Sequence, residues 1–287
     1  MKILVTGAGG QTGKAIIKAF LRKGIDVCAM VHRESQSEQM SEMGVSKTAV
    51  GDMMNPTDLR NALDGADAVY FICSAGNPDE YKMGQLAIEI SKEMNIKHFI
   101  YHSVLHSLLS EMPHHKQKNQ VENVLVNSGL NYTVIQPAVL MQNLQMSLEQ
   151  VKQSGVWRQK FYTGNDTALC MVDLNDVAEA AAVVAKNLET HTGATYELCG
   201  TENLKLDNVI NILCELYHKE VTAEYISDQE FLNGLKKFKA SEYRQDMMIK
   251  MFRHYNEHSF IGNAMTLSHL LGRKPRTLSE CLTETDK

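Results

Sequence analysis

The sequence is poor in the residues that mark disordered, collagen-like or disulfide-stapled chains. It has 5 prolines and 18 glycines in 287 residues, and 44% of its residues are hydrophobic, which is typical of a globular chain that can bury a large core. The six cysteines are scattered and none forms a Cys-x-x-Cys pair. A zinc cluster or a disulfide framework is therefore not indicated, and we expect reduced, buried thiols.

The chain also has no excess of positive charge and no long apolar run. Lysine plus arginine number 29 against 34 aspartates plus glutamates, a formal net charge of −5, which argues against direct nucleic-acid binding. No stretch approaches the roughly 18 apolar residues that span a membrane. The first apolar strand starts at residue 3 without a signal-like segment before it, so we expect a cytoplasmic protein with no membrane partner.

What the sequence does contain is an alternation of short apolar runs with amphipathic stretches. The runs predict strands at residues 3–5, 26–31, 68–73, 98–102 and 132–136, and the stretches predict helices at 14–23, 35–43, 83–94 and 116–127. Strands that alternate with helices at this spacing form βαβ units, whose crossovers cover a parallel sheet. We predict the α/β class, with a doubly wound parallel Rossmann sheet.

The pattern becomes less regular after Pro137, which predicts a smaller mixed α/β lobe at the C-terminal end. We assign residues 1–138 to an NAD(P)-binding Rossmann domain whose sheet is completed by residues 166–188. The smaller lobe then takes residues 139–165 and 189–287. No Pro/Gly-rich linker separates the two, so we expect a shared interface with a substrate cleft.

The most informative segment is the glycine-rich run that follows the first predicted strand and precedes the first predicted helix. Glycines there allow a tight turn, a close approach of the backbone to a pyrophosphate and close packing of helix on strand. The helix N-terminus offers unpaired amides to the phosphates. The predicted cofactor contacts are Thr6, Gly7, Gly10, Gln11, Thr12 and Gly13.

The end of the second strand distinguishes the two nicotinamide cofactors. An acidic residue about 20 positions past the loop suits a ribose hydroxyl, and a basic residue suits a 2′-phosphate. Arg33 stands 20 positions after Gly13, so NADP(H) is favoured over NAD(H). In the alternative interpretation Arg33 is an ordinary surface charge and Glu34 binds the ribose.

The G-x-x-G-x-x-G spacing after Thr6 resembles the short-chain dehydrogenase/reductase superfamily, in its extended and atypical branches. The resemblance implies that Asp52 and Met53 flank the adenine. It also implies further cofactor contacts at the carboxyl edge of the sheet, from Cys73, Ser74 and Ala75 after the fourth strand and from Pro137.

The sequence departs from that superfamily at its catalytic Tyr-x-x-x-Lys pair. None of the ten tyrosines has a lysine four positions later, and the expected place holds His114-x-x-x-Lys118. This replacement, with residues 118–137, 171–178 and 270–278, resembles the NmrA-like atypical branch. That branch contains transcriptional co-regulators, redox sensors and NADPH-dependent quinone or dye reductases.

Loss of the tyrosine does not by itself prevent hydride transfer, because an electron-poor acceptor can take its proton from water or an imidazole. His114 is the candidate proton donor, since an ordinary imidazole titrates near pH ~6.5; alternatively it is a solvated loop histidine. The resemblance makes Lys118 an anchor for ribose hydroxyls. Ser103 is a candidate ligand of a substrate oxygen, or else a strand-end cap.

Two functional hypotheses follow. The first is an NADPH-dependent reductase of a quinone-like or other conjugated, electron-poor small molecule. The second is a non-catalytic sensor whose affinity for a protein partner changes with NADP(H). Sugar-nucleotide epimerisation is disfavoured because it relies on the missing tyrosine. The pattern His254-x-x-Glu257-His258 is typical of zinc proteases, but such sites also need a third protein ligand and a helical frame. A chance match is easy in a chain with 11 histidines, so we predict no metal site.

Overall fold

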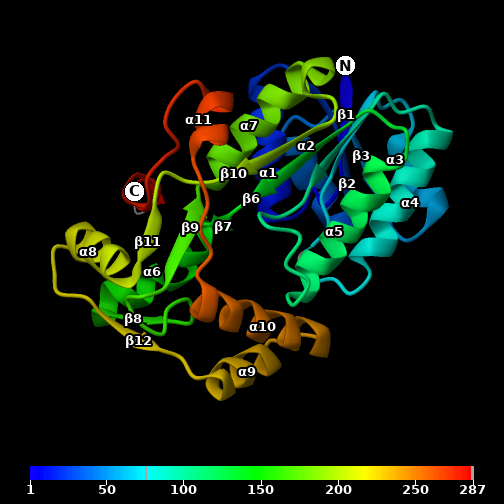
Figure 1. Ribbon diagram of the computed structural model, residues 1–287. Coiled ribbons are helices and arrows are strands. Elements are labelled where there is room, and N and C mark those ends of the chain that lie inside the picture. The colour runs from blue at the N-terminus through cyan, green and yellow to red at the C-terminus, as the bar shows by residue number, and fades with distance from the viewer. Residues whose placement is uncertain (75, 286–287) are drawn as a thin grey trace. The chain divides into compact units, whose positions relative to one another are not determined.

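The computed structural model describes residues 1–74 and 76–285, which form two compact units (Figure 1). Unit 1 comprises residues 1–110, 114–137 and 174–197, and unit 2 comprises residues 111–113, 138–173 and the chain from 198 onward. Each unit is therefore built from segments that are separated in the sequence.

Unit 1 alternates strands and helices along the chain. Its elements are β1 (Lys2–Val5), α1 (Gln11–Arg22), β2 (Asp26–Val31), η1 (Glu34–Gln36), α2 (Ser37–Glu42), β3 (Lys47–Val50), α3 (Pro56–Leu63), β4 (Ala68–Phe71), α4 (Glu80–Glu93), β5 (His98–His102), α5 (Pro113–Val126), β6 (Tyr132–Pro137), α7 (Leu174–Lys186), η2 (Leu188–His191) and β10 (Ala194–Leu198). This order confirms the predicted alternation.

The strands of unit 1 form one seven-stranded sheet in the order β10-β6-β5-β4-β1-β2-β3. The pairings from β3 through β1 to β6 are parallel. The predicted α/β class and doubly wound Rossmann sheet are thus confirmed. Because the strands run the same way, the loop after β1 and the loops after β4, β5 and β6 share one edge of the sheet.

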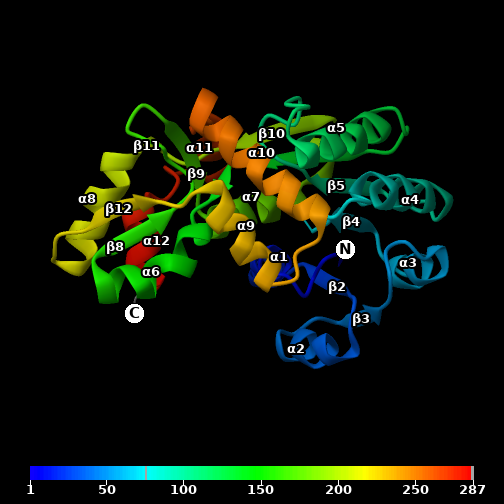
Figure 2. The ribbon, with the colours of Figure 1, turned by 90° about the horizontal axis from the view of Figure 1, so that it is seen from below.

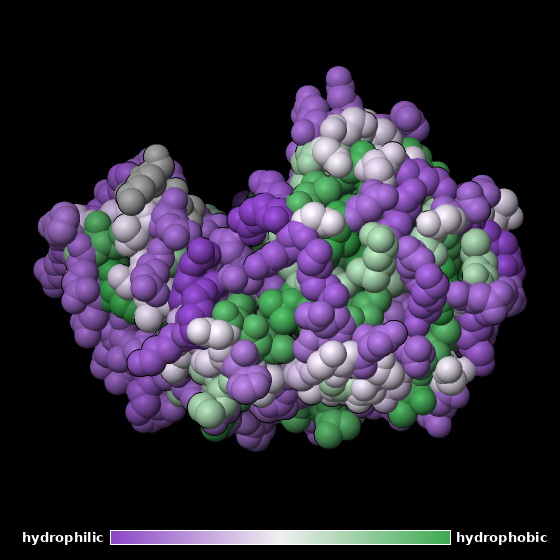
Figure 3. Space-filling model, turned by 90° about the horizontal axis from the view of Figure 1, so that it is seen from above, coloured by the Kyte–Doolittle hydropathy of each residue, from purple (hydrophilic) through white to green (hydrophobic). Residues whose placement is uncertain are grey.

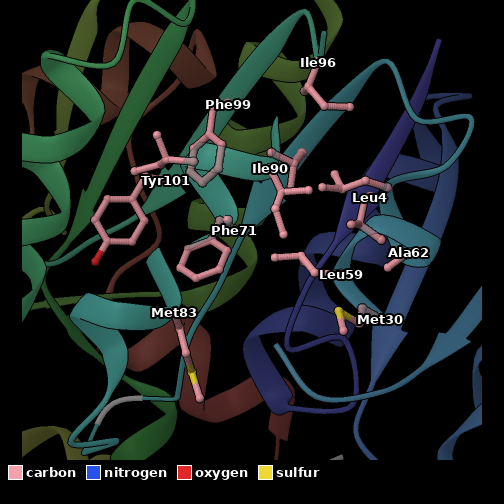
Figure 4. Packing of buried hydrophobic residues seen from close by; sticks show 14 of the residues in the cluster. Leu4, Met30, Leu59, Ala62, Phe71, Met83, Ile90, Ile96, Phe99 and Tyr101 are labelled. Carbon is pink, nitrogen blue, oxygen red and sulfur yellow. The ribbon is translucent and has the colours of Figure 1, made fainter. Parts of the chain in front are cut away.

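One face of this sheet is covered by α3, α4 and α5, and the other by α1 and α7, which pack on each other (Figure 2). The first face holds a cluster of buried apolar side chains (Figure 4). The cluster joins Leu4 and Phe71 from the strands to Leu59, Ile90 and Val121 from the three helices. Burial on both faces explains why β4 is an uninterrupted apolar run.

Local signals fix the start of α3, an element that the periodicity alone does not predict. The Asn55 side chain accepts hydrogen bonds from the backbone N–H groups of Thr57 and Asp58, and Pro56 occupies the first turn. An asparagine cap followed by proline is a favoured helix start.

Unit 2 contains the remaining elements and two small sheets. They are β7 (Val139–Leu140), α6 (Gln142–Ser154), β8 (Val156–Gln159), β9 (Ala168–Val172), β11 (Asn203–Lys205), α8 (Leu206–Tyr217), β12 (Thr222–Tyr225), α9 (Asp228–Lys237), α10 (Glu242–His258), α11 (Met265–Leu271) and α12 (Leu278–Thr285). The sheets have the orders β11-β9-β7 and β12-β8.

The segment expected to complete the large sheet differs from the prediction. Of residues 166–188, only helix α7 belongs to unit 1, while β9 joins the sheet of β11 and β7. The seventh strand is β10, from the segment assigned to the smaller lobe. Both segments are five residues long; residues 168–172 are apolar throughout, and residues 194–198 are apolar at alternate positions. Either pattern suits a strand, so the local sequence does not indicate which sheet each strand joins.

Hydrophilic side chains are spread over the face shown in Figure 3, with scattered apolar groups between them. Among the described residues, no helix has both the length and the hydropathy to cross a membrane. The six cysteines are free thiols, five of them buried.

Candidate nucleotide-binding site and its surroundings

The glycines of the loop between β1 and α1 are required by close backbone contacts. Gly7 has a positive φ of 56°, and a Cβ atom there would lie 3.0 Å from the Ile72 carbonyl oxygen. A Cβ atom at Gly13 would lie 2.4 Å from the Gly7 carbonyl oxygen, closer than any side chain allows. Glycine at these two positions lets α1 pack directly on the loop.

The N-terminus of α1 is open. Its N-cap, Gly10, is extended (φ −81°, ψ 166°), no side chain caps the helix, and the first turn has no acidic residue. Gly10 and Gln11 are exposed and Thr12 is half-buried. Unpaired amides and the positive end of the helix dipole therefore face solvent without a competing carboxylate. These residues fit the pyrophosphate of a dinucleotide.

Thr6, in contrast, faces the interior. Its side chain is fully buried; its hydroxyl donates to the Ile72 carbonyl at 2.9 Å and accepts from the Ile72 N–H at 2.8 Å. The hydroxyl therefore joins the end of β1 to the end of β4, and the role of Thr6 as a cofactor contact stays a prediction.

The end of β2 places Arg33 on the surface, beside the glycine loop. Arg33 is exposed and makes no ion pair with another described residue. Its backbone N–H donates to Gln36 Oε1 at 3.1 Å. The Gln36 side chain lies against Gly9, where a Cβ atom would come within 2.0 Å of Gln36 Nε2. Gln36 thus connects the segment after β2 with the glycine loop.

Asp52 and Met53 follow β3 at the same edge of the sheet. Asp52 is exposed, its carboxylate accepts from the Met54 N–H at 2.9 Å, and its own N–H donates to Asp58 Oδ2 at 2.9 Å. Met53 is half-buried against the apolar cluster. The turn is therefore fixed by its own hydrogen bonds.

Cys73 has its thiol in the core. The side chain is 5% exposed and lies 3.6 Å from Met83 Sδ, and burial raises the pKa of the thiol to about 12. Only the backbone of Cys73 remains for the predicted cofactor contact. Ser74 is exposed and accepts from Asn77 at its carbonyl, and Ala75 lies outside the described residues. Pro137 is buried at the end of β6.

Lys118 is engaged by another side chain, a contact that no local sequence pattern predicts. Its ammonium lies 2.6 Å from Glu80 Oε1 and 3.1 Å from the His102 carbonyl oxygen. The two charged side chains are 5% and 1% exposed. The Tyr101 hydroxyl donates to the same Glu80 oxygen at 3.1 Å. The expected open ribose anchor is therefore a buried ion pair in this structure.

His114 does not suit the proton-donor role that we assigned to it. The side chain is 6% exposed, and its Nδ1 atom has no hydrogen-bond partner among the described residues. Burial, with smaller effects from the neighbouring His115 and Lys118, lowers the pKa of His114 to about 2. The burial of His114 shows that the solvated-loop interpretation is wrong. The proton-donor role stays a prediction, which the lowered pKa does not favour.

Ser103 donates its hydroxyl to Glu122, one turn beyond Lys118 on α5. Glu122 also accepts from Ser107 at 2.9 Å and from Gln136 at 2.8 Å. These groups border a cavity of about 440 Å³ within unit 1, lined by His106, Ser107, Leu108, Leu109, Glu122, Gln136 and Glu197. The buried hydroxyl of Ser103 is thus linked to the cavity through Glu122, which lines it.

Four residues of this region were not predicted as site residues: Gln36, Glu80, Gln117 and Glu122. They are polar residues inside helical or turn segments, with no spacing that distinguishes them from surface positions. Only Glu122 lies in a segment, residues 118–137, that carries the family resemblance. In the zinc-protease pattern, the rings of His254 and His258 lie 4.8 Å apart and are tilted by 52° to each other. No cluster of three metal-type side chains occurs in the described part of the chain.

A doubly wound sheet whose first loop presents an open helix N-terminus defines a dinucleotide-binding type of protein. The chain belongs to the NmrA-like family, which it matches over residues 1–283. It is 24% identical over 283 residues to quinone oxidoreductase 2 of Escherichia coli K12, covering 98% of this chain and 97% of that protein. It is also 24% identical over 279 residues to an NAD(P)H azoreductase of Xenophilus azovorans, covering 97% and 96%.

Solved structures show the same fold. The NADPH-dependent quinone oxidoreductase of E. coli, complexed with NADPH, superposes with a TM-score of 0.85 at 24% identity, covering 99% of this chain and all of that one. The negative transcriptional regulator NmrA superposes with a TM-score of 0.80 at 18% identity, covering 99% and 94%. The fold is therefore shared by a reductase and a regulator.

Proposed function

We propose that the protein is an NADPH-dependent oxidoreductase that transfers hydride to a quinone-like or other conjugated acceptor. The observation that carries the proposal is the open N-terminus of α1 behind Gly7 and Gly13, where extra Cβ atoms would fill the loop. Membership of the NmrA-like family and the activities in the names of two relatives support it.

Different residues bind different parts of the cofactor in this proposal. The backbone amides at Gln11 and Thr12 hold the pyrophosphate, because the Gly10 N–H already donates to the Gly7 carbonyl at 3.0 Å. Arg33 binds the 2′-phosphate, because a guanidinium pairs with phosphate through parallel hydrogen bonds. The exposed, unpaired position of Arg33 leaves its donors available. A bound reduced nicotinamide supplies the hydride.

The phenol beside Lys118 is that of Tyr101, which is buried and donates its hydrogen bond to Glu80. His114 is buried too, and burial lowers its pKa. Neither group is placed as an exposed acid for the acceptor. An acceptor that is already electron-poor suits such a site, since hydride addition needs no prior protonation and the proton can come from water. For a quinone, one hydride and one proton give the hydroquinone, and the cofactor leaves oxidised.

The cavity beside Ser103 is the proposed acceptor site. It lies where β5, β6 and β10 end, at the same edge as the glycine loop. Leu108 and Leu109 offer an apolar wall, and Gln136 and Ser107 offer polar groups for an acceptor oxygen. An apolar cavity with a few fixed polar groups suits a conjugated small molecule.

Steady-state turnover tests the proposal. The protein is mixed with NADPH and a panel of quinones and dyes while absorbance at the nicotinamide band is followed; we expect oxidation of NADPH that depends on the acceptor. NADH serves as the matched cofactor and should be used less well. Failure with every acceptor would exclude the reductase.

A second candidate is an NADP(H)-sensing regulator that acts through a protein partner. The missing catalytic phenol, the buried His114 and the similarity of fold to NmrA favour it. Tight NADPH binding together with no turnover on any acceptor is the outcome that would select this function.

A further inference from the structure

Gly9 lies in the glycine loop but outside the spacing Gly7-x-x-Gly10-x-x-Gly13 that marks the loop in the sequence. Its φ is not positive, so no left-handed turn requires glycine at this position. The reason is a neighbour: the three atoms nearest to a Cβ atom built there all belong to the Gln36 side chain. Glycine at position 9 therefore leaves room for the carboxamide of Gln36.

The Gln36 carboxamide is held in one orientation. Its Oε1 atom accepts a hydrogen bond from the Arg33 N–H at 3.1 Å, and only the oxygen of an amide group can accept from a backbone N–H. The nitrogen, Nε2, is therefore the end that lies over Gly9. Nε2 donates to no other described residue, so its two N–H groups remain available to a ligand.

Backbone hydrogen bonds join the glycine loop to the end of β2 and to the turn after it. The Ala8 N–H donates to the Met30 carbonyl oxygen at 3.2 Å, and the Gln36 N–H donates to the Arg33 carbonyl oxygen at 3.0 Å. The loop and the turn thus form one surface. Arg33 is exposed on this surface and Gln36 is half-buried in it.

The covalent structure of NADP(H) determines which part of the molecule lies over this surface. The adenosine ribose carries both the pyrophosphate and the 2′-phosphate, so it has to lie between the residues that bind these two groups. In the proposed function those residues are Gln11 and Thr12 on one side and Arg33 on the other. Gln36 contacts both the glycine loop, at Gly9, and the backbone of Arg33. Its carboxamide therefore borders the ribose.

The hydrogen-bonding groups that remain on Gln36 distinguish a phosphate from a hydroxyl. Its oxygen is turned toward the Arg33 N–H, and its nitrogen can only donate. A 2′-phosphate offers several acceptor oxygens and matches such a donor. The 2′-hydroxyl of NAD(H) is bound best by a carboxylate, which accepts. A neutral amide also adds no negative charge that would repel the phosphate.

We propose that Gln36 is a specificity-determining residue of the nucleotide site: its Nε2 atom donates to the adenosine 2′-phosphate beside Arg33. Gly9 is the second member of the arrangement, because the lack of a side chain there keeps the amide in place. The inference rests on the proposed function, since it takes NADPH as the ligand.

Gln36→Glu is the first test. Glutamate has the same length and keeps an oxygen for the Arg33 N–H, but it replaces the donor by a charged acceptor. Fluorescence titration should show NADPH binding weakened by about tenfold or more, because a carboxylate repels the phosphate. The dissociation constant for NADH should change by less than about threefold, since NADH has no 2′-phosphate. An unchanged ratio of the two constants would overturn the proposal.

Gln39→Glu is the matched control, because it makes the same change at an exposed position of α2 and should bind both cofactors as the wild type does. Gln36→Ala separates donation from mere exclusion of charge. It removes the amide without adding a carboxylate and should weaken NADPH binding by about three- to tenfold, with NADH nearly unaffected. Wild-type binding of NADPH by Gln36→Ala would refute the donor role, even if Gln36→Glu binds weakly.

Gly9→Ala tests the arrangement from the other side. The added Cβ atom would meet the far end of a flexible side chain, so it should displace the amide and leave the loop in place. NADPH binding should weaken by the same factor as in Gln36→Ala. The double variant should bind no more weakly than Gln36→Ala alone, because the amide is already absent. Additive losses, or equal losses for NADPH and NADH, would contradict the arrangement.

The wild-type titration distinguishes failure of this inference from failure of the proposed function. Wild-type protein that binds neither dinucleotide refutes the proposed function and this inference with it. Wild-type protein that prefers NADPH, with Gln36 variants that keep the wild-type preference, leaves the proposed function standing and refutes the role of Gln36.

Discussion

The hydroxyl of Thr6 is both donor and acceptor to the backbone of Ile72, at 2.9 and 2.8 Å. This reciprocal contact joins the ends of β1 and β4 next to the proposed pyrophosphate site. The β1–β4 register ends at the pair Val5–Tyr70, so the Thr6 hydroxyl continues the connection beyond the last registered pair. A single buried hydroxyl thus satisfies two main-chain groups.

Thr6→Val should therefore destabilise the protein by about 1–3 kcal/mol, because the buried N–H and C=O of Ile72 would lose their partner while the size of the side chain is kept. Thr6→Ser retains the hydroxyl and is the control. Urea unfolding of both variants measures the difference. Equal stabilities for valine and wild type would show that water replaces the hydroxyl.

Gly13→Ala should abolish nucleotide binding and lower stability, because its Cβ atom would meet the Gly7 carbonyl oxygen at 2.4 Å. Gly234→Ala in α9 is the matched change, since nothing lies within 4 Å of a Cβ atom there. That variant should gain up to about 1 kcal/mol from helix propensity. Thermal unfolding measures the stability of both variants, and NADPH titration measures their nucleotide binding. Normal NADPH binding by Gly13→Ala would contradict the assigned loop.

Arg33→Ala should remove the preference for NADPH over NADH. The loss of a charge-assisted phosphate contact costs about 1.5–3 kcal/mol, roughly ten- to a hundredfold in the dissociation constant for NADPH, with little change for NADH. Arg22→Ala, at the exposed C-terminal end of α1, controls for net charge. Fluorescence titration with both cofactors gives the ratio; equal wild-type affinities would refute the role of Arg33.

Acid should destabilise the fold through its buried histidines. Burial lowers the pKa of His98 to about 4 and of His102 to about 3, from an ordinary value of 6.5. At a pH between the folded-state pKa of each histidine and the ordinary value of 6.5, the unfolded chain binds a proton that the folded chain does not. Stability is therefore complete above pH 6.5 and falls as the pH drops, by up to about 1.4 kcal/mol per pH unit for each histidine.

His98→Gln should reduce the stability difference between pH 7 and pH 5 by about 1–2 kcal/mol, because one group no longer takes up a proton on unfolding. The exposed His269, changed to Gln, is the control. Denaturant titrations at the two pH values make the comparison. An undiminished difference in His98→Gln would assign the acid sensitivity to other groups.

Leu108→Ala tests the position of the acceptor. Leu108 is 82% exposed at the cavity, so its truncation should not affect folding. Loss of its apolar contact should raise the KM of a hydrophobic acceptor by about three- to tenfold, at about 25 cal/mol per Å² of lost contact. The KM for NADPH should stay constant. An unchanged acceptor KM would place the acceptor elsewhere.

The sequence predicts the α/β layers and the glycine loop because both depend on local patterns. Apolar runs such as residues 26–31 and 68–73 are buried on both faces of the sheet, and Gly7 and Gly13 have contacts that only glycine permits. These features need no knowledge of distant segments.

The errors arise where distant segments meet. Lys118 resembles an open anchor until Glu80, 38 positions away, is placed beside it. His114 resembles an ordinary imidazole until packing removes water from it. Likewise, β10 joins the large sheet through β6, a pairing that no local period encodes. Contacts between distant segments, and not local propensity, determine the environment of Lys118 and His114 and the position of β10.

The late return of the chain into unit 1 has a consequence for biosynthesis. Residues 174–197 supply α7, which packs on α1, and β10, which covers the edge of β6. A nascent chain that stops at Pro137 would leave a bare β6 edge and the apolar side of α1 uncovered, features that promote self-association. Unit 1 can therefore be completed only after about sixty residues beyond Pro137 have been synthesised. A truncated chain that keeps the whole large sheet has to extend at least to residue 198, where β10 ends.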